Sequence, residues 1–486
     1  MVIVLVLVAL LVLAVLVTAN WYVWRRLFRD TTEHPGPVRR AGAVLIGGGW
    51  ALAVGALVAE RAGAPFPLQQ ALAWPGFLWL ALSVYLLLAL LAGEAVRPLL
   101  RRLPTRRTRA GGAGSGAGTP AGGAEPAPSP RPWPSPWPKV PVVAVPRRGP
   151  RPRPTPWAPP RPGVLLGQEA PPGPAARRPG PPPPRPGRRS PPRRPPRPPP
   201  SRPPPVTGQP SALSRRLFVS RVVAGAAAAA AVGTVGYGTY GVLRGPSVKR
   251  VTVPLAKLPR AAHGYRIAVV SDIHLGPVLG RGFAEKVVDT INATQPDLIA
   301  VVGDLVDGSV KDLGPAAAPL ARLKARHGSF FVTGNHEYFS GAEQWVAEVR
   351  DLGLRPLENA RTELPWFDLA GVNDVQGENE GHGPDFARAL GDRDTTRACV
   401  LLAHQPVQIH EAVRHGVDLQ LSGHTHGGQL WPGSLIAELA NPTVAGLERY
   451  GDTQLYVSRG AGAWGPPTRV GAPSDITVVQ LAARAI

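Results

Sequence analysis

The stretch "RIAVVSD" (Arg266–Asp272) sets the pattern for the second half of the chain. It is a short apolar run that ends in polar residues, which predicts a buried strand with a carboxylate at its carboxyl end. Four later stretches have the same form: "DLIAVVGD" (297–304), "SFFVTGN" (329–335), "CVLLAH" (399–404) and "DLQLSGH" (418–424). An amphipathic helix is expected at "GFAEKVVDTINAT" (282–294). This alternation predicts an α/β domain whose sheets are covered on both faces.

Each of these strands ends in residue types that bind metal ions. The candidates are Asp272, His274, Asp304, Asn335, His404, His424 and His426. Ligands gather at the carboxyl ends of strands in α/β sheets, so these side chains are expected to converge. In Asp-x-His and His-x-His, extended backbone would point both side chains the same way, so we expect each pair to serve one cluster. The glycines in "LSGHTHGGQL" (421–430) would let the backbone turn sharply.

The donor types limit the choice of metal. Seven donors exceed the needs of one four-coordinate ion, which favours two neighbouring divalent ions with a shared carboxylate. Cys399 is the only cysteine, so thiolate-based zinc binding and an intrachain disulfide are both excluded. We interpret Cys399 as a small buried strand residue. Nitrogen and oxygen ligands without thiolate suit Mn, Fe or Zn.

The motifs "SDIH", "GD", "GNHE", the lone His404 and "GHTHGGQ" together resemble, in this order, the calcineurin-like metallophosphoesterase superfamily. The resemblance covers about residues 250–483. It is similar more narrowly to bacterial membrane-associated members, through "GNHEY", "HQP", "LSGHTHGGQ" and "YVSRGAGAWGPPTR". The implied fold is a two-sheet α/β sandwich, with the metals at one edge, in a domain of residues 246–486.

The resemblance also implies a role for each candidate. Asp272, His274 and His426 would hold the first metal. Asn335, His404 and His424 would hold the second, and Asp304 would bridge the two. A metal-bridged hydroxide would attack phosphorus, and His336 would protonate the leaving oxygen. The implied reaction is hydrolysis of phosphomonoesters or phosphodiesters.

Several nearby residues have less certain interpretations. We interpret Asp307, in "GDLVD", as a turn residue or a neighbour of a ligand. Glu337 would either orient His336 or cap the following helix. A separate set, in "SRGAGAWGPPTR", would either line the substrate pocket or pack the loop: Arg459, Trp464 and Arg469.

The two halves of the chain differ in charge. Of 54 Lys+Arg and 32 Asp+Glu, residues 246–486 hold 22 and 26, so the excess of basic residues belongs to the first half. Residues 1–103 contain three apolar stretches long enough to span a bilayer: 2–17, 41–59 and 71–93. Basic residues flank the loop between the first two stretches and follow the third, which places both on the cytoplasmic side and the amino terminus outside.

Residues 104–213 are rich in Pro, Arg, Gly and Ala, which predicts a disordered tether. A plain spacer is the first interpretation, contact with anionic lipids the second, and docking of partner proteins or nucleic acid the third. Residues 214–245, with "SRRLFVS" before an Ala/Gly-rich segment, resemble a twin-arginine export signal; a fourth transmembrane helix is the alternative. Either one places the domain that follows outside the cytoplasm.

The leading hypothesis is therefore a multi-pass cell-membrane protein with an extracytoplasmic two-metal phosphoesterase domain. One alternative is a hydrolase of lipid-linked pyrophosphates or phosphodiesters, because a membrane anchor would hold the site near lipid headgroups. Another is a non-catalytic membrane scaffold that uses the basic Pro-rich segment. No nucleic-acid partner is expected, because the acidic balance of residues 246–486 gives that domain no basic surface excess.

Overall fold

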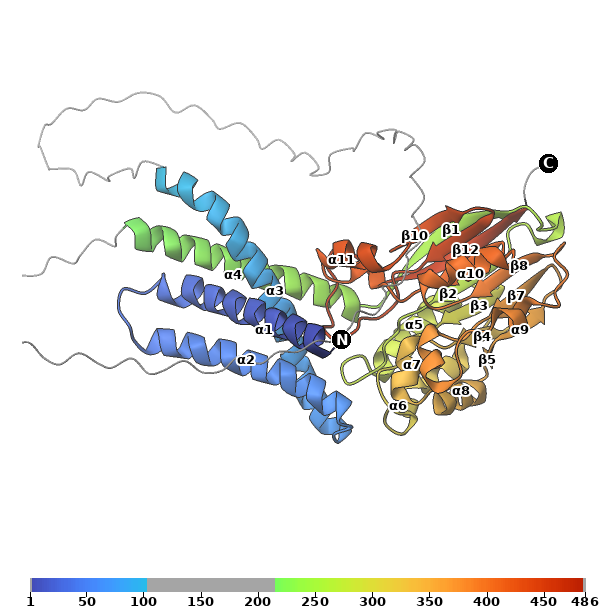
Figure 1. Ribbon diagram of the computed structural model, residues 1–486, viewed down its shortest axis with the longest axis horizontal. Helices are drawn as coiled ribbons and strands as arrows, with labels where there is room; N and C mark the ends of the chain where they lie inside the picture. Colours follow the sequence, from blue (N-terminus) through green and yellow to red (C-terminus); the bar gives the residue numbers. More distant parts are fainter. Residues whose placement is uncertain (1, 103–214, 484–486) are drawn as a thin grey trace, which may run out of the picture. The chain divides into compact units, whose positions relative to one another are not determined.

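The computed structural model describes residues 2–102 and 215–483 (Figure 1). Among them are four helices long and apolar enough to cross a membrane: α1 (Val2–Trp24), α2 (Pro37–Arg61), α3 (Phe66–Arg102) and α4 (Arg215–Leu243). The three stretches expected at the amino terminus lie within α1, α2 and α3. The proposed tether falls outside the described residues, so its disorder stays a prediction.

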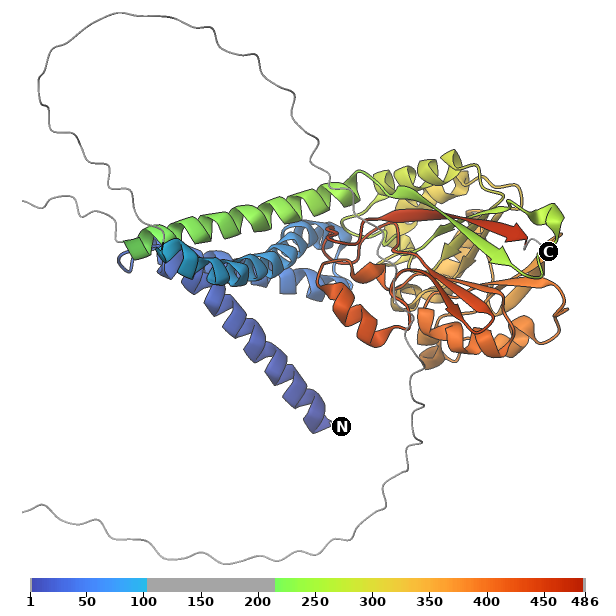
Figure 2. The same ribbon diagram turned by 90° about the horizontal axis from the view of Figure 1, so that it is seen from above.

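Helix α4 begins at Arg215, one residue into the "SRRLFVS" motif, and it also contains the whole Ala/Gly-rich segment. It runs without a break and leads directly into the first strand of the domain (Figure 2). It packs against α3, where a Cβ on Gly93 would meet the side chain of Val223 of α4 at 2.6 Å. Both the twin-arginine interpretation and the alternative of a fourth transmembrane helix stay predictions.

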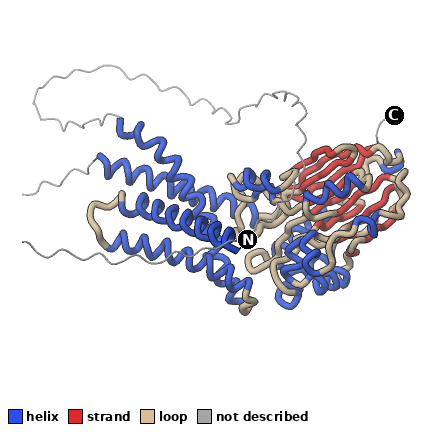
Figure 3. Tube along the Cα trace, viewed as in Figure 1, coloured by secondary structure: helices blue, strands red, loops and turns tan. Residues whose placement is uncertain are grey.

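Residues 247–483 form two six-stranded sheets (Figure 3). The first has the order β1 (Ser247–Leu255), β12 (Asp475–Ala483), β2 (Arg266–Val270), β3 (Leu298–Val302), β4 (Ser329–Val332), β5 (Arg355–Pro356). The second has the order β10 (Gly446–Tyr450), β11 (Thr453–Val457), β9 (Leu419–Ser422), β8 (Ala398–Leu402), β7 (Phe367–Gly371), β6 (Ala360–Glu363). Strands β2 to β5 are parallel, and so are β7, β8, β9 and β11.

Strand β3 explains why these runs are apolar throughout. Leu298, Ala300 and Val302 belong to the core that includes residues of both sheets, whereas Ile299 and Val301 pack with the helices. Both faces of the strand are therefore buried, which requires apolar residues at successive positions. Each fully buried aliphatic side chain contributes roughly 1.5–3 kcal/mol. The expected sandwich with covered sheets is confirmed.

The helices of the domain fall into two groups. Those packed with the first sheet include α5 (Arg281–Ala293), α6 (Val310–Ala317) and α8 (Ala342–Asp351). Those packed with the second sheet are α9 (Phe386–Leu390) and α10 (Ile409–Arg414). Cys399 lies in that second core, fully buried, and burial raises the pKa of its thiol to about 12. Two short helices, α7 (Asn335–Ser340) and α11 (Gly433–Ala440), extend from the carboxyl-end loops.

Candidate metal centre

The first cluster of candidate ligands forms where β2 and β9 end. Asp272 and His274 follow β2, His426 follows β9, and all three are buried. Nε2 of His274 lies 3.0 Å from Nε2 of His426, which in turn lies 3.3 Å from Oδ1 of Asp272. Their ligand atoms are close enough to bind one ion together.

The second cluster forms beside it, from the ends of β3, β4, β8 and β9. Asp304, His404 and His424 have ligand atoms within 4.8 Å of one another. Asn335 joins them, because its Oδ1 lies 3.0 Å from Nδ1 of His424. The structure therefore brings all seven sequence-predicted candidates into one site.

Asp304 lies between the two clusters. Its Oδ2 is 3.1 Å from Nε2 of His404 in the second cluster and 3.8 Å from Nε2 of His274 in the first. Burial works against ionisation of this carboxylate, but neighbouring His404 and His274 hold its pKa well below the usual range. An anion in this position can be shared by two cations.

One expectation about the paired motifs is wrong. The two histidines of "GHTH" do not serve one cluster: His426 is in the first and His424 in the second. The reason is the backbone, which is not extended after the strands. Left-handed φ angles occur at Asp272 (51°), His274 (48°), Asp304 (53°), His424 (71°) and His426 (52°). Non-glycine residues adopt this region at a cost, and such strain is concentrated at functional sites.

The hydrogen bonds of His404 fit a bound cation. Its Nδ1 lies 2.8 Å from the carbonyl oxygen of Val302 and donates to it, which directs Nε2 into the site. Nε2 is fully buried and makes no hydrogen bond of adequate geometry among the described residues, although Oδ2 of Asp304 lies nearby. A buried nitrogen without a hydrogen bond is costly unless a cation occupies the lone-pair direction.

Asp307 has a larger role than a turn residue. Its Oδ1 accepts from Nδ1 of His274 at 2.8 Å and lies 2.7 Å from Nδ1 of His336. Burial opposes its ionisation, but these two histidines lower its pKa to about 2. Asp307 therefore fixes a proton on Nδ1 of each ring and directs both Nε2 atoms away from itself. Its position three residues after Asp304, in "GDLVD", was the available sequence signal.

His336 stands at the rim of the site. Its side chain is 13% exposed and lies against the rings of Phe339 and Trp464, with centroids at 5.4 and 5.7 Å. Burial opposes protonation, but the hydrogen bond and charge of Asp307 raise its pKa to about 9. The ring is therefore an imidazolium near neutral pH. Trp464 lies beside it, and the interpretation that this residue lines a substrate pocket stays a prediction.

Glu337 lies in the first turn of α7 and caps that helix, and it also supports the site. Its carboxylate accepts from the backbone N–H groups of Asp304 at 3.0 Å, Leu305 at 2.7 Å and Gly334 at 2.6 Å. It does not contact the His336 side chain, so the orienting role falls to Asp307. Burial raises the pKa of Glu337 to about 7. These three bonds hold the turns after β3 and β4 in register.

Arg469 packs the loop, as one of its two interpretations predicted. Its guanidinium donates to the carbonyl oxygens of Gly462, His426 and Ala472, and its Nη2 lies 3.1 Å from Nδ1 of His426. An arginine can only donate, so Nδ1 of His426 accepts and its Nε2 carries the proton toward His274. Binding of a cation at Nε2 of His426 therefore requires that proton to leave.

Substitution of Gly303 by alanine is expected to damage the site strongly. Gly303 has φ +72°, and a Cβ there would lie 2.6 Å from Nδ1 of His404 and 2.7 Å from the backbone of Gly334. The left-handed strain and the overpacking together predict a loss of about 2–5 kcal/mol in the free energy of unfolding. Chemical denaturation of the full chain measures this loss.

Gly353→Ala is the matched control. Gly353 has φ +88° with nothing within 4 Å of its Cβ position, so it isolates the backbone contribution. We expect this variant to lose only about 1–2 kcal/mol. Equal losses in the two variants would show that the space beside His404 is not tightly packed.

The comparisons with known proteins agree with this geometry. The family model "Calcineurin-like phosphoesterase" matches residues 265–428. An uncharacterized metallophosphoesterase of Aquifex aeolicus is 37% identical over 48% of this chain and 91% of its own length. The uncharacterized metallophosphoesterase YkuE of Bacillus subtilis is 30% identical over 55% of this chain and 98% of its own length.

A vertebrate relative is also similar. The "Transmembrane protein with metallophosphoesterase domain" of Danio rerio is 40% identical over 50% of this chain, and the match spans 59% of that relative's length. The family match includes the ends of β2, β3, β4, β8 and β9, where all seven candidate ligands lie. The chain belongs to the calcineurin-like phosphoesterase family.

Proposed function

We propose that this chain is a membrane-anchored, metal-dependent phosphoesterase that uses two divalent cations. The observation that carries the proposal is the position of Asp304, whose Oδ2 lies between His404 of one cluster and His274 of the other. Asp272, His274 and His426 would hold the first cation. Asn335, His404 and His424 would hold the second, with Asp304 shared.

The described residues divide the chemistry among themselves. Two bound divalent cations supply an activated water molecule and neutralise charge on the phosphoryl oxygens. His336 carries a proton at Nε2 as well as at Nδ1, because Asp307, which contacts Nδ1, outweighs the burial of the ring and raises its pKa to about 9. The Nε2 proton is positioned for the oxygen that leaves when the phosphate ester breaks. Phe339 and Trp464 pack against the ring in edge-to-face geometry.

The membrane topology follows from charge and from contacts. We propose that α1 to α4 all span the membrane, with the domain and the amino terminus on the extracytoplasmic side. The guanidinium of Arg61, at the end of α2, lies 5.7 Å from the ring centroid of Phe339 in the domain. Phe66, at the start of α3, packs against the core of the domain. These contacts support placing the α2–α3 connection on the same side as the domain, as four consecutive spans require.

Removal of metal is expected to abolish activity and to destabilise the domain. A chelator should eliminate hydrolysis of bis(p-nitrophenyl) phosphate by the full chain, and Mn²⁺ should restore it. A cation that binds only the folded state adds about 2.7 kcal/mol per site when its free concentration is about 100 times Kd. Thermal unfolding of the chelated and reloaded protein measures this difference. An unchanged rate and midpoint after verified removal of metal would contradict the proposal.

The scaffold alternative is disfavoured by the site itself. A binding module has no need for an acid such as His336 held by a dedicated carboxylate, Asp307, beside the two clusters. Variants that keep the fold and lose only turnover distinguish the two functions.

A further inference from the structure

Helix α11 (Gly433–Ala440) is an unusual surface element of the domain. It contains no buried residue. Leu435 is 59% exposed, Ile436 71% and Leu439 88%, and Trp431 just before the helix is 55% exposed. Positions 435, 436 and 439 lie on one face of the helix, and Ser434 and Glu438 lie outside that face. A contiguous group of large exposed apolar side chains marks an interaction surface.

The segment that leads into α11 already packs among the membrane helices. Leu430 belongs to the same apolar cluster as Tyr85 of α3 and Val235 of α4. The hydroxyl of Tyr85 also donates to the carbonyl oxygen of Trp431 at 3.0 Å. Helix α11 is thus continuous in the chain with a segment that packs against two helices with the length and composition to cross a bilayer. This continuity favours lipid, rather than another protein, as the partner that covers the exposed apolar face of α11.

The end of α4 has the side chains of a membrane–water interface. Tyr237 is 81% exposed and Tyr240 63%, and both are followed by Arg244. Aromatic residues with a polar end concentrate at the headgroup level, and a cation beyond them contacts anionic headgroups. Arg244 forms no ion pair with any residue in the described ranges. This end of α4 therefore places the headgroup level beside the carboxyl-end loops of the domain.

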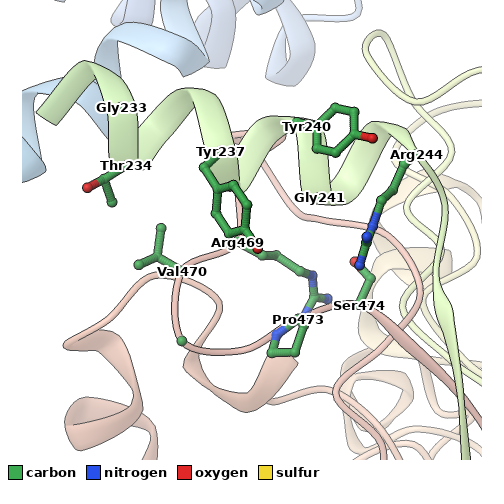
Figure 4. A pocket seen from close by; sticks show the side chains of 12 residues that line it. Gly233, Thr234, Tyr237, Tyr240, Gly241, Arg244, Arg469, Val470, Pro473 and Ser474 are labelled. Carbon is green, nitrogen blue, oxygen red and sulfur yellow. The ribbon is translucent and has the colours of Figure 1, made fainter. Parts of the chain in front are cut away.

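A cavity of about 540 Å³ lies at the same level, between α4 and residues 469–474. Figure 4 shows Tyr237 and Arg244 reaching from α4 toward this segment. Val470, on the far wall, packs in the cluster that also contains Leu430. The cavity offers an apolar space beside a cation, which suits part of a phospholipid.

Helix α11 is connected rigidly to the metal centre. It begins five residues after Gly428, and a Cβ on Gly428 would lie 2.2 Å from the backbone nitrogen of Ser434. Between them, Gln429 donates to the carbonyl oxygen of Trp464 at 2.8 Å and accepts from its N–H at 3.0 Å. One loop therefore carries His426, α11 and the support for Trp464 beside His336.

We propose that α11 is an interfacial helix, with Leu435, Ile436 and Leu439 in the acyl-chain region of the bilayer, and that the metal centre acts on phosphate esters of membrane lipids. Insertion of α11 holds the rim of the site at the headgroup level, where a lipid presents its phosphate. The substrate part of this inference rests on the phosphoesterase activity proposed above.

A single label measures insertion directly. The Leu439→Cys variant of the full chain is labelled at the new cysteine with the environment-sensitive fluorophore NBD. It is then reconstituted at one copy per nanodisc. Cys399 stays unlabelled, because it is fully buried with a pKa raised to about 12. We expect blue-shifted emission that lipids with brominated acyl chains quench. Asp392→Cys, where the native side chain is 84% exposed, is the water-exposed control.

The outcomes separate the possible partners of α11. Emission at position 439 like that of the Asp392→Cys control would overturn insertion. A blue shift without quenching by brominated lipid would mean that protein covers α11, which also overturns it.

A kinetic experiment tests the substrate class. The probes are dioleoyl phosphatidic acid and dioleoyl phosphatidylglycerol in nanodiscs, and soluble bis(p-nitrophenyl) phosphate. We expect hydrolysis of at least one lipid, and replacement of Leu435, Ile436 and Leu439 by serine should lower kcat/KM for that lipid about tenfold or more. Turnover of the soluble ester should be unchanged. Hydrolysis of the soluble ester but of neither lipid would overturn the lipid substrate class. Absence of all hydrolysis by metal-loaded protein would instead count against the proposed activity, and the label would still report insertion.

Discussion

Asp304→Asn is expected to lower kcat/KM for phosphate esters by about a thousandfold or more, which corresponds to about 4 kcal/mol of transition-state stabilisation. The carboxylate is the group nearest to both clusters, with Oδ2 at 3.1 Å from His404 and 3.8 Å from His274. An amide has nearly the same shape but no charge to share between two cations. Rates with bis(p-nitrophenyl) phosphate and p-nitrophenyl phosphate, together with metal content by mass spectrometry, measure the effect.

The fold of this variant should survive. Oδ1 of Asp304 accepts from the backbone N–H of His336 at 2.9 Å, and the amide oxygen of asparagine can accept the same bond. Asp418→Asn is the matched control: Asp418 precedes the opposite end of β9 and accepts from the N–H of Cys399 at 2.9 Å. It should keep its activity. An Asp304→Asn protein with full turnover would exclude the shared-carboxylate role.

The sequence was sufficient to locate the site because the pattern is local. An apolar run that ends in Asp or His identifies a buried strand and its carboxyl end together, and parallel strands bring these ends to one edge. Asp304 and His404, from different sheets, meet for this reason. The α/β domain with covered sheets and the set of candidate ligands were predictable in this way, whereas the two-sheet arrangement was implied by the family resemblance.

The distribution of ligands between clusters was not predictable from spacing. It depends on hydrogen bonds between distant segments, such as His424 N–H to Oδ1 of Asp272 at 3.0 Å. The backbone at His424 and His426 is left-handed and so departs from the extended geometry on which the spacing argument depended. The family resemblance supplied the assignment that the spacing argument missed.

Residues that support the site were harder to identify, because each serves several segments. Glu337 joins the turns after β3 and β4, and Arg469 joins three loop carbonyls to His426. Neither role has a local signal. The apolar face of α11 is short and adjoins a histidine-rich loop, so only its exposure in the folded domain draws attention to it.

His336→Ala is expected to lower kcat by about 10²–10⁴-fold, the usual contribution of a positioned general acid, while the metal content stays unchanged. His336 belongs to neither ligand cluster around Asp304, and its Nδ1 is committed to Asp307. The loss should be smaller for p-nitrophenyl phosphate than for an alkyl phosphate, because p-nitrophenolate leaves readily without a proton. Comparison of these two substrates separates acid catalysis from a general disturbance of the site.

The pH dependence gives the second signature of this role. Burial opposes protonation of His336, but Asp307 raises its pKa to about 9, above the ordinary 6.5. The active form is the protonated one, so wild-type kcat for the alkyl ester should be retained at neutral pH and lost as the pH rises through that raised pKa. The His336→Ala protein should lack this basic limb, since no proton remains to be lost at that position. If the limb persisted in the variant, another group would be the acid, and Asp307 would serve only to orient His274.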